Sequence, residues 1–273
     1  MIYAHRVQGM PSWCLSNKIM PLIEKGWQDE GKPVHFFWGL AGTNIKLIQE
    51  CEEKKEDWWY IDLGYIGNKI TRYPQPIIHD EDKTYFRIVK GGIHTIRCKV
   101  GDGRRLQDLR NRLKEDAEFK GWYTGKTNHI LLCPSSPTVT YHINGITQQQ
   151  WIDEVIKEIR KYTDREVKVR NKPRPGNEWW GKDIKNDLVD AHCLVTNMSL
   201  ASVDSVLNYV PAITHKRNVA SFVTSRDISK IEKPMRPGRK TMEEWLKMLA
   251  ENQFRLEEIE NGVAYETLKG QRV

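Results

Sequence analysis

Residues 129–137 read His-Ile-Leu-Leu-Cys-Pro-Ser-Ser-Pro, an apolar run that ends in a polar turn with two prolines. A short apolar run closed by turn residues is typical of a buried strand. Cys193–Thr196 is a second run of this kind, and helical periodicity recurs at 147–162, 183–190 and 241–252. Strands that alternate with helices predict a parallel, helix-flanked sheet in the second half of the chain.

The first half also predicts an α/β arrangement. Short β-like runs such as Val34–Leu40 and Trp58–Leu63 alternate with helical patterns at 15–30 and 43–56. Pro21 lies inside the first of these patterns and predicts either a kink or a late helix start. The turn-rich residues 124–128 then predict a domain boundary, so we expect one lobe over 1–126 and another over 127–273.

Composition excludes several classes of protein. The 273 residues carry 43 Lys and Arg against 36 Asp and Glu, a net charge of +7. No apolar run is long enough for a membrane span, and no secretory signal is visible at the N-terminus. The five cysteines are scattered, which excludes a CxxC zinc or redox module. The sequence also lacks GxxxxGK[ST] and GxGxxG, so no P-loop or ordinary dinucleotide site is expected. We therefore expect a cytoplasmic protein with reduced thiols and no membrane partner.

Positive charge is concentrated in three segments. Segment 87–114 has nine Lys and Arg against two acids, 160–174 has seven against two, and 214–240 has eight against two. Such segments indicate a polyanionic partner, although solvated surface is the alternative for each of them.

Two polar loops are the candidate binding residues of the second half. Ser135 and Ser136 follow the first apolar run, while Asn197, Ser199 and Ser202 follow the second. Ligands bind beyond the carboxyl ends of parallel strands, and small hydroxyl residues at a helix start suit a phosphate. The alternative for Ser199 is a plain helix N-cap.

Arg170 and Lys172 follow the strand predicted at 166–169, where two cations can hold a diphosphate. The alternative is a basic surface turn. In the first half, Asp62 stands in an otherwise apolar strand, where burial favours a general base; the alternative is an Asp bonded to local N–H groups. His94 is either a second acid/base or a structural histidine.

We expect no metal. The acidic triplet at 80–82 resembles a motif that binds a divalent metal, but the sequence around it is typical of an exposed turn.

The segment 166–268 resembles the donor-binding half of GT-B-type glycosyltransferases. The resemblance rests on an Arg-Asn-Lys-Pro turn, a strand that ends near a serine, a following helix and a hydrophobe-Pro strand. These are residues 170–173, Asp190–Ser199, Ser202–Leu207, Val210–Ile213 and Trp245–Glu258. Tyr209 replaces the glycine that the family often has before Val-Pro, and 273 residues are few for two full Rossmann domains.

The resemblance implies a compact GT-B-type architecture, with two Rossmann-like lobes and a cleft between them. The first lobe would bind the acceptor, with Asp62 deprotonating its hydroxyl. The second would hold a nucleotide sugar, with a UDP-sugar favoured. Ser135 and Ser136 would lie near the phosphates, Arg170 and Lys172 around nucleotide and phosphate, and Ser199 and Ser202 at the diphosphate. The family generally works without a metal or other cofactor.

The first half, including Phe36–Gly42 and Tyr60–Tyr65, looks like phage-encoded proteins of similar layout. Some of these are linked to sugar transfer onto hydroxymethylated pyrimidines in DNA. That likeness implies a duplex DNA acceptor and action in the cytoplasm of an infected bacterial host. Two alternatives stay open: a glycosyltransferase with a glycan or protein acceptor, and a non-enzymatic nucleic-acid-binding phage protein.

Overall fold

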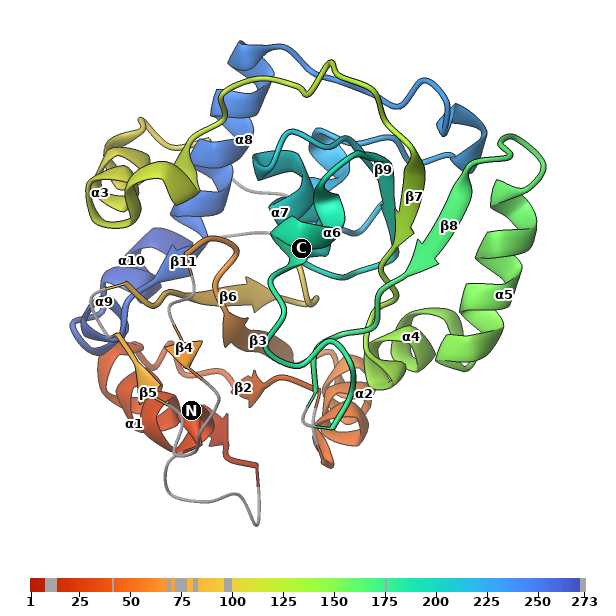
Figure 1. Ribbon diagram of the computed structural model, residues 1–273. Coiled ribbons are helices and arrows are strands. Elements are labelled where there is room, and N and C mark those ends of the chain that lie inside the picture. Colours follow the sequence, from red (N-terminus) through yellow and green to blue (C-terminus); the bar gives the residue numbers. More distant parts are fainter. Residues whose placement is uncertain are drawn as a thin grey trace. The chain divides into compact units, whose positions relative to one another are not determined.

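The computed structural model describes residues 1–7, 14–40, 42–67, 70–71, 78–80, 83–95, 100–174 and 176–270. The chain divides into two compact units (Figure 1). Unit 1 comprises residues 1–117 and 246–273, and unit 2 comprises residues 118–245. The sequence analysis placed 246–273 in the second lobe, whereas in the structure this C-terminal segment is part of unit 1.

Unit 1 contains a five-stranded mixed sheet in the order β1-β2-β3-β6-β11. Its strands are β1 (Ile2–His5), β2 (Val34–Trp38), β3 (Asp57–Leu63), β6 (Phe86–Lys90) and β11 (Gln253–Phe254). The first three are parallel, and β6 is antiparallel to both β3 and β11. Because β11 pairs with β6, the C-terminal segment completes this sheet. A two-stranded ribbon of β4 (Ile70–Thr71) and β5 (Ile78–His79) is separate from it.

The two faces of the unit 1 sheet differ in polarity. One face packs against α1 (Leu15–Gly26), α9 (Leu256–Glu260) and α10 (Val263–Leu268) in a wholly apolar core. The sheet contributes alternate strand residues to this core: Phe36, Trp59, Ile61, Phe86 and Ile88. Since side chains alternate along a strand, the intervening positions face the other way. Those positions combine apolar residues such as Phe37 and Val89 with polar ones: His5, His35, Tyr60, Asp62 and Arg87.

The remaining helices of unit 1 are α2 (Asn44–Lys54), α3 (Arg104–Leu113) and the 3-10 turn η1 (Lys114–Ala117). Leu106, Leu109 and Leu113 form the buried face of α3. α1 begins at Leu15 and continues through Pro21, so the late helix start is not observed.

Unit 2 contains a four-stranded, fully parallel sheet in the order β10-β9-β7-β8. The strands are β7 (His129–Leu132), β8 (Glu166–Val169), β9 (Ala191–Thr196) and β10 (Ala212–Thr214). Ile130 and Leu132 of β7 pack in one apolar cluster, and Leu131 packs in another. Strands buried on both faces read as continuous apolar runs, which is why the sequence revealed them.

Helices cover both faces of the unit 2 sheet (Figure 1). α5 (Gln148–Ile159) packs on one face, and α6 (Ile184–Leu188) and α7 (Ala201–Leu207) on the other. The other elements are α4 (Pro137–Asn144), η2 (Val219–Phe222), η3 (Ile228–Lys230) and the first part of α8 (Arg239–Glu251), which belongs to unit 1 from Leu246 on. This confirms the α/β fold class and the parallel, helix-flanked sheet. The sequence analysis missed α4, whose Pro-Ser-Ser-Pro start it treated as a loop. No helix in the described ranges is both long and apolar enough to cross a bilayer.

Candidate active site

The unit 2 sheet has a topological switch point between β7 and β9. After β7 the chain adds β8 on one side, and then β9 and β10 on the other. Ligands of open α/β sheets bind beyond the carboxyl ends of the strands at such a point. The two loops predicted from the sequence, 133–136 and 197–200, leave these two adjacent strand ends.

Hydrogen bonds fasten the two loops to each other. The Met198 N–H donates to Ser135 Oγ at 2.9 Å. Ser202 Oγ donates to the Ser199 carbonyl at 3.0 Å and lies 3.1 Å from Asn218 Oδ1. Ser135 and Ser202 are buried. Their hydroxyls therefore position the loops, and their expected contact with phosphate stays a prediction.

Ser136 and Ser199 are half-buried, and each hydroxyl accepts a backbone N–H at the start of a helix. Ser136 is the N-cap of α4, whereas the N-cap of α7 is Leu200. Ser136 Oγ accepts from the Val139 N–H at 3.4 Å, and Ser199 Oγ accepts from the Ala201 N–H at 3.2 Å. Ser199 precedes the N-cap of α7, so it is not the plain N-cap of the alternative, although its hydroxyl accepts from the first N–H of the helix. No hydrogen bond among the described residues uses the backbone N–H of Ser136 or Ser199. Both N–H groups are therefore available to a ligand.

Asn197 has a buried oxygen without a partner. Its Nδ2 donates to Asn144 Oδ1, while its own Oδ1 accepts no hydrogen bond from the described residues. Only 3% of Asn197 is exposed. A buried acceptor left unsatisfied costs about 1–3 kcal/mol. A donor group of a ligand would satisfy it, and this oxygen lies directly after β9 at the switch point.

Arg170 is engaged inside unit 2. Its guanidinium donates to the Asp187 carboxylate and to the Lys182 carbonyl, and it lies 5.2 Å from the Trp179 ring centroid. Arg170 is 4% exposed, so its charge serves to hold segment 170–187 in place. Lys172 is exposed, and its carbonyl accepts from Asn177 Nδ2 at 3.1 Å. Arg170 is thus held by Asp187 and Lys182, and the expected binding of a diphosphate by Arg170 and Lys172 stays a prediction.

In unit 1, Asp62 is held by three donors. Asp62 Oδ2 accepts from the Tyr60 hydroxyl at 2.7 Å and from Arg87 Nη2 at 3.1 Å, and Oδ1 accepts from the Leu63 N–H at 2.8 Å. Burial, followed by the Asp62 charge, raises the pKa of Tyr60 well above its ordinary value. The prediction that Asp62 has apolar surroundings is therefore wrong. Its side chain is 32% exposed, so solvent also reaches the carboxylate.

His94 belongs to the same polar region. It is 4% exposed and packs edge-on against Tyr65, and burial followed by the nearby Arg87 charge holds its pKa well below the ordinary value. Arg87 Nε also donates to the Ile93 carbonyl at 3.2 Å. The two predicted catalytic residues, Asp62 and His94, thus lie near the same buried arginine, which donates to Asp62 and lowers the pKa of His94. The sequence analysis counted Arg87 only as part of a basic segment.

Gln253 of β11 is a second residue that the sequence analysis missed. Its Oε1 accepts from the N–H groups of Tyr65 at 2.8 Å and Ile66 at 3.0 Å, while its buried Nε2 has no partner among the described residues. Only long-range strand pairing places this residue here, so no local signal could have revealed it.

Unit 1 also contains a cavity of about 470 Å³ that the sequence did not predict. Its lining is mainly charged: Tyr85, Gly101, Asp102, Arg104, Arg105, Asp108, Leu109, Ala250, Glu251 and Glu258. Burial raises the pKa of Glu251, and it raises the pKa of Tyr85 to about 12. The buried Tyr85 hydroxyl has no hydrogen-bond partner in the described part of the chain. The cavity offers both donors and acceptors to a polar ligand.

The three basic segments differ in how their charges are used. In 87–114 and 160–174, many cations pair within the protein, with partners Arg87–Asp62, Lys90–Asp57, Arg105–Glu258, Arg165–Glu232 and Arg170–Asp187. All eight cations of 214–240 are exposed, and none forms an ion pair with a described residue. Segment 214–240, in unit 2, thus keeps all of its cations exposed and free of ion pairs with described residues, as binding of a polyanion requires.

Comparison with known proteins identifies no family. No family model matches the chain, and no curated protein does. Among solved structures, the chain is similar to one titled "Thermosulfurimonas dismutans KpsC, beta Kdo 2,4 transferase", with 13% identity, coverage of 86% of this chain and 87% of that one, and a TM-score of 0.49. It is also similar to "Thermosulfurimonas dismutans KpsC, beta Kdo 2,7 transferase", with 12% identity, coverage of 92% and 89%, and a TM-score of 0.43. Likeness at this level leaves the activity to be argued from the chain's own residues.

Proposed function

We propose that this chain is a glycosyltransferase whose unit 2 binds a nucleotide sugar, with a UDP-sugar favoured. The observation that carries the proposal is the buried Asn197 Oδ1, which has no partner among the described residues and lies between two hydrogen-bonded polar loops at the switch point. The resemblance of segment 166–268 to GT-B-type donor domains supports the same assignment.

The donor would use groups that already have fixed directions. Asn197 Oδ1 would accept from a hydroxyl or N–H of the nucleotide, and the N–H groups of Ser136 and Ser199 would face the diphosphate. Donors fixed in advance stabilise the charge that develops on the leaving diphosphate without reorganisation. Arg170 would act indirectly in this scheme, by holding segment 170–187.

Asp62 is the proposed general base. Its carboxylate would take the proton of the acceptor hydroxyl as the hydroxyl oxygen attacks the anomeric carbon and the nucleoside diphosphate leaves. Tyr60, Arg87 and the Leu63 N–H fix its orientation, and its partial exposure leaves it accessible. His94, buried beside Arg87, would tune this group rather than transfer protons itself.

The proposed acceptor is a hydroxymethylated pyrimidine in phage DNA, modified in the cytoplasm of the infected host. The support is segment 214–240, whose eight cations are exposed and unpaired among the described residues. Lysine and arginine that neutralise phosphates make binding strongly dependent on salt.

Donor binding is tested by thermal shift and calorimetry with UDP and UDP-sugars. A ligand at a hundred times its Kd adds about 2.7 kcal/mol of stability, which Asn197→Leu should abolish. Asn144→Ala is the matched control, because it removes the same Asn–Asn hydrogen bond and keeps the Asn197 acceptor. If no nucleotide stabilises the wild type, the donor site is refuted and a non-enzymatic protein is favoured.

Transfer is tested by mass spectrometry of hydroxymethylated DNA incubated with a UDP-sugar. The mass should rise by one sugar, with no rise on unmodified DNA, and Asp62→Asn should abolish turnover but keep nucleotide binding. Transfer to a glycan or protein but not to DNA would support the alternative acceptor.

DNA contact is tested separately by filter binding at two salt concentrations. Lys216→Glu/Arg217→Glu should weaken binding and its salt dependence. Lys126→Glu/Lys157→Glu, at exposed positions elsewhere in unit 2, is the charge-matched control. Equal losses in both variants would remove segment 214–240 from the proposed interface.

A further inference from the structure

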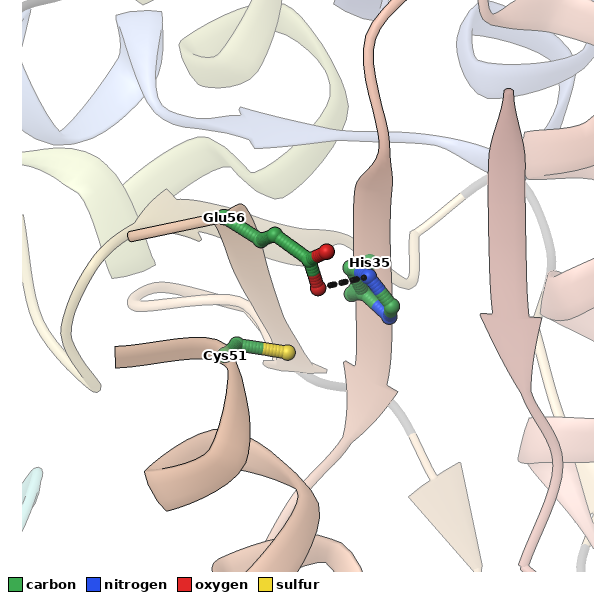
Figure 2. Close-up of side chains that lie close together, drawn as sticks. All are labelled: His35, Cys51 and Glu56. Carbon is green, nitrogen blue, oxygen red and sulfur yellow. Dashed lines mark ion pairs between the residues drawn. The ribbon is translucent and has the colours of Figure 1, made fainter. Parts of the chain in front are cut away.

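Three potential metal ligands of unit 1 lie close together: His35 on β2, Cys51 on α2, and Glu56 between α2 and β3. Their ligand atoms are all within 4.8 Å of one another. Figure 2 shows the Cys51 sulfur and the Glu56 carboxylate both pointing toward the His35 ring. None of the three was singled out by the sequence analysis, because their spacing fits no familiar motif.

Local structure brings two of the ligands together at the end of α2. Lys55 has a left-handed conformation with φ of 56°, its N–H donates to the Glu52 carbonyl, and the Glu56 N–H donates to the Cys51 carbonyl at 2.9 Å. This pair of bonds is the Schellman motif that ends many helices. It turns the chain back, so that Glu56 lies over Cys51.

Strand pairing supplies the third ligand. β2 and β3 are parallel, with His35 opposite Trp58. Glu56 comes two residues before Trp58, which leaves its carboxylate within reach of the His35 ring. The ring of His35 is fixed on both sides: it stacks on Tyr3 at 4.7 Å, and its Nδ1 is hydrogen-bonded to His5 Nε2 at 2.9 Å. A hydrogen bond to the far ring nitrogen is the usual means of orienting a metal-binding histidine.

The remaining nitrogen, His35 Nε2, is buried and makes no hydrogen bond within the described residues. A Glu56 oxygen lies only 3.1 Å from it, yet outside the direction that a ring N–H requires. Close approach without a directed hydrogen bond is what two ligands of one cation show. On tetrahedral zinc, nitrogen and oxygen ligands are separated by about 3.4 Å, given metal–ligand distances near 2.1 Å.

We propose that His35 Nε2, Cys51 Sγ and the Glu56 carboxylate bind one divalent transition-metal ion, with Zn²⁺ the best match. Imidazole, thiolate and carboxylate together suit zinc, whereas magnesium and calcium take oxygen ligands. The Cys51 Sγ must move by on the order of 1 Å toward the other two ligands to reach bonding distance of the metal. Three protein ligands leave the fourth position to water or a ligand, and the 28% exposed Glu56 side chain provides access from solvent. On binding, the thiol proton is released to solvent as the S–Zn bond forms.

The test uses Co²⁺ as a spectroscopic probe on the full chain. Wild-type protein should bind one equivalent and develop a thiolate-to-cobalt charge-transfer band, which Zn²⁺ displaces. Cys51→Ala should lose the band, whereas Cys14→Ala, another buried cysteine of unit 1, should keep it. A band absent from the wild type, or one that survives Cys51→Ala, would overturn the proposal.

Competition with a chromophoric chelator then measures the affinity for zinc. Glu56→Gln should weaken binding by at least tenfold, and His5→Gln should weaken it 10–100-fold, as the loss of a supporting hydrogen bond does. Far-UV circular dichroism of each variant separates ligand loss from misfolding. Unchanged affinity in correctly folded Glu56→Gln and His35→Gln would show that only adventitious thiol binding occurs.

Discussion

Replacing Arg87 with methionine should lower the free energy of unfolding by about 3–5 kcal/mol. Arg87 is 5% exposed, and its guanidinium donates to the carbonyls of Leu63 and Ile93, to the Tyr60 hydroxyl and to Asp62. Methionine keeps most of the volume of the side chain and removes all of these donors.

The magnitude follows from what is left behind. Each buried acceptor that loses its donor costs about 1–3 kcal/mol, and the Leu63 and Ile93 carbonyls both do so. The loss of the ion pair with Asp62 adds less to this cost, because the Asp62 side chain is 32% exposed and water can partly replace the arginine. The sum agrees with the range measured when one partner of a buried ion pair is removed.

The assay is urea unfolding followed by tryptophan fluorescence, with the slope m compared between variants. Arg104→Met is the matched control, because Arg104 pairs with Asp102 at 2.6 Å but has a side chain that is 90% exposed. That surface pair should contribute less than about 1 kcal/mol. A loss below about 1 kcal/mol for Arg87→Met, with m unchanged, would refute the buried network.

Three further predictions concern stability. The folded-state pKa of His94 is depressed, so its contribution to stability is present above pH 6.5 and is lost as pH falls, by on the order of 1.4 kcal/mol per pH unit. His94→Gln should reduce this loss of stability, measured as urea midpoints from pH 7.5 to 5. An unchanged pH profile in the variant would contradict the prediction. Lys55→Gly should stabilise the protein by about 0.5–1 kcal/mol, because Lys55 has φ of 56° and glycine adopts that conformation without strain; a lower thermal midpoint would argue against this. Gly26→Ala should be strongly destabilising, because a Cβ there would lie 1.8 Å from the Ile259 carbonyl oxygen. Gly238→Ala is the control and should be nearly neutral, because the space around Gly238 is open. Equal thermal midpoints for the two variants would contradict the close approach of Gly26 to Ile259.

The sheet of unit 2 could be predicted because its strands are buried on both faces. Ile130 and Leu132 pack on one side and Leu131 on the other, so the sequence shows an unbroken apolar run. The loops at the carboxyl ends of β7 and β9 followed from the same pattern, because parallel strands align their ends. The order of the strands, and so the switch point, did not follow from it.

Charged residues were the hardest to interpret. Arg170 looked like a free cation after a strand, yet Asp187 and Trp179 engage it. Asp62 looked isolated in an apolar strand, yet Arg87 reaches it from the neighbouring strand β6. A partner supplied by another element leaves no trace in the local sequence.

The sequence by itself determined the α/β class, the parallel sheet of unit 2 and the position of its polar loops, because periodicity records which side of each element is buried. Only the tertiary structure decided that β11 returns to the first sheet, that segment 214–240 keeps its charges unpaired among the described residues, and that His35, Cys51 and Glu56 meet. These features depend on contacts between distant parts of the chain. Such contacts follow from strand order and register, which local patterns of hydrophobicity do not encode.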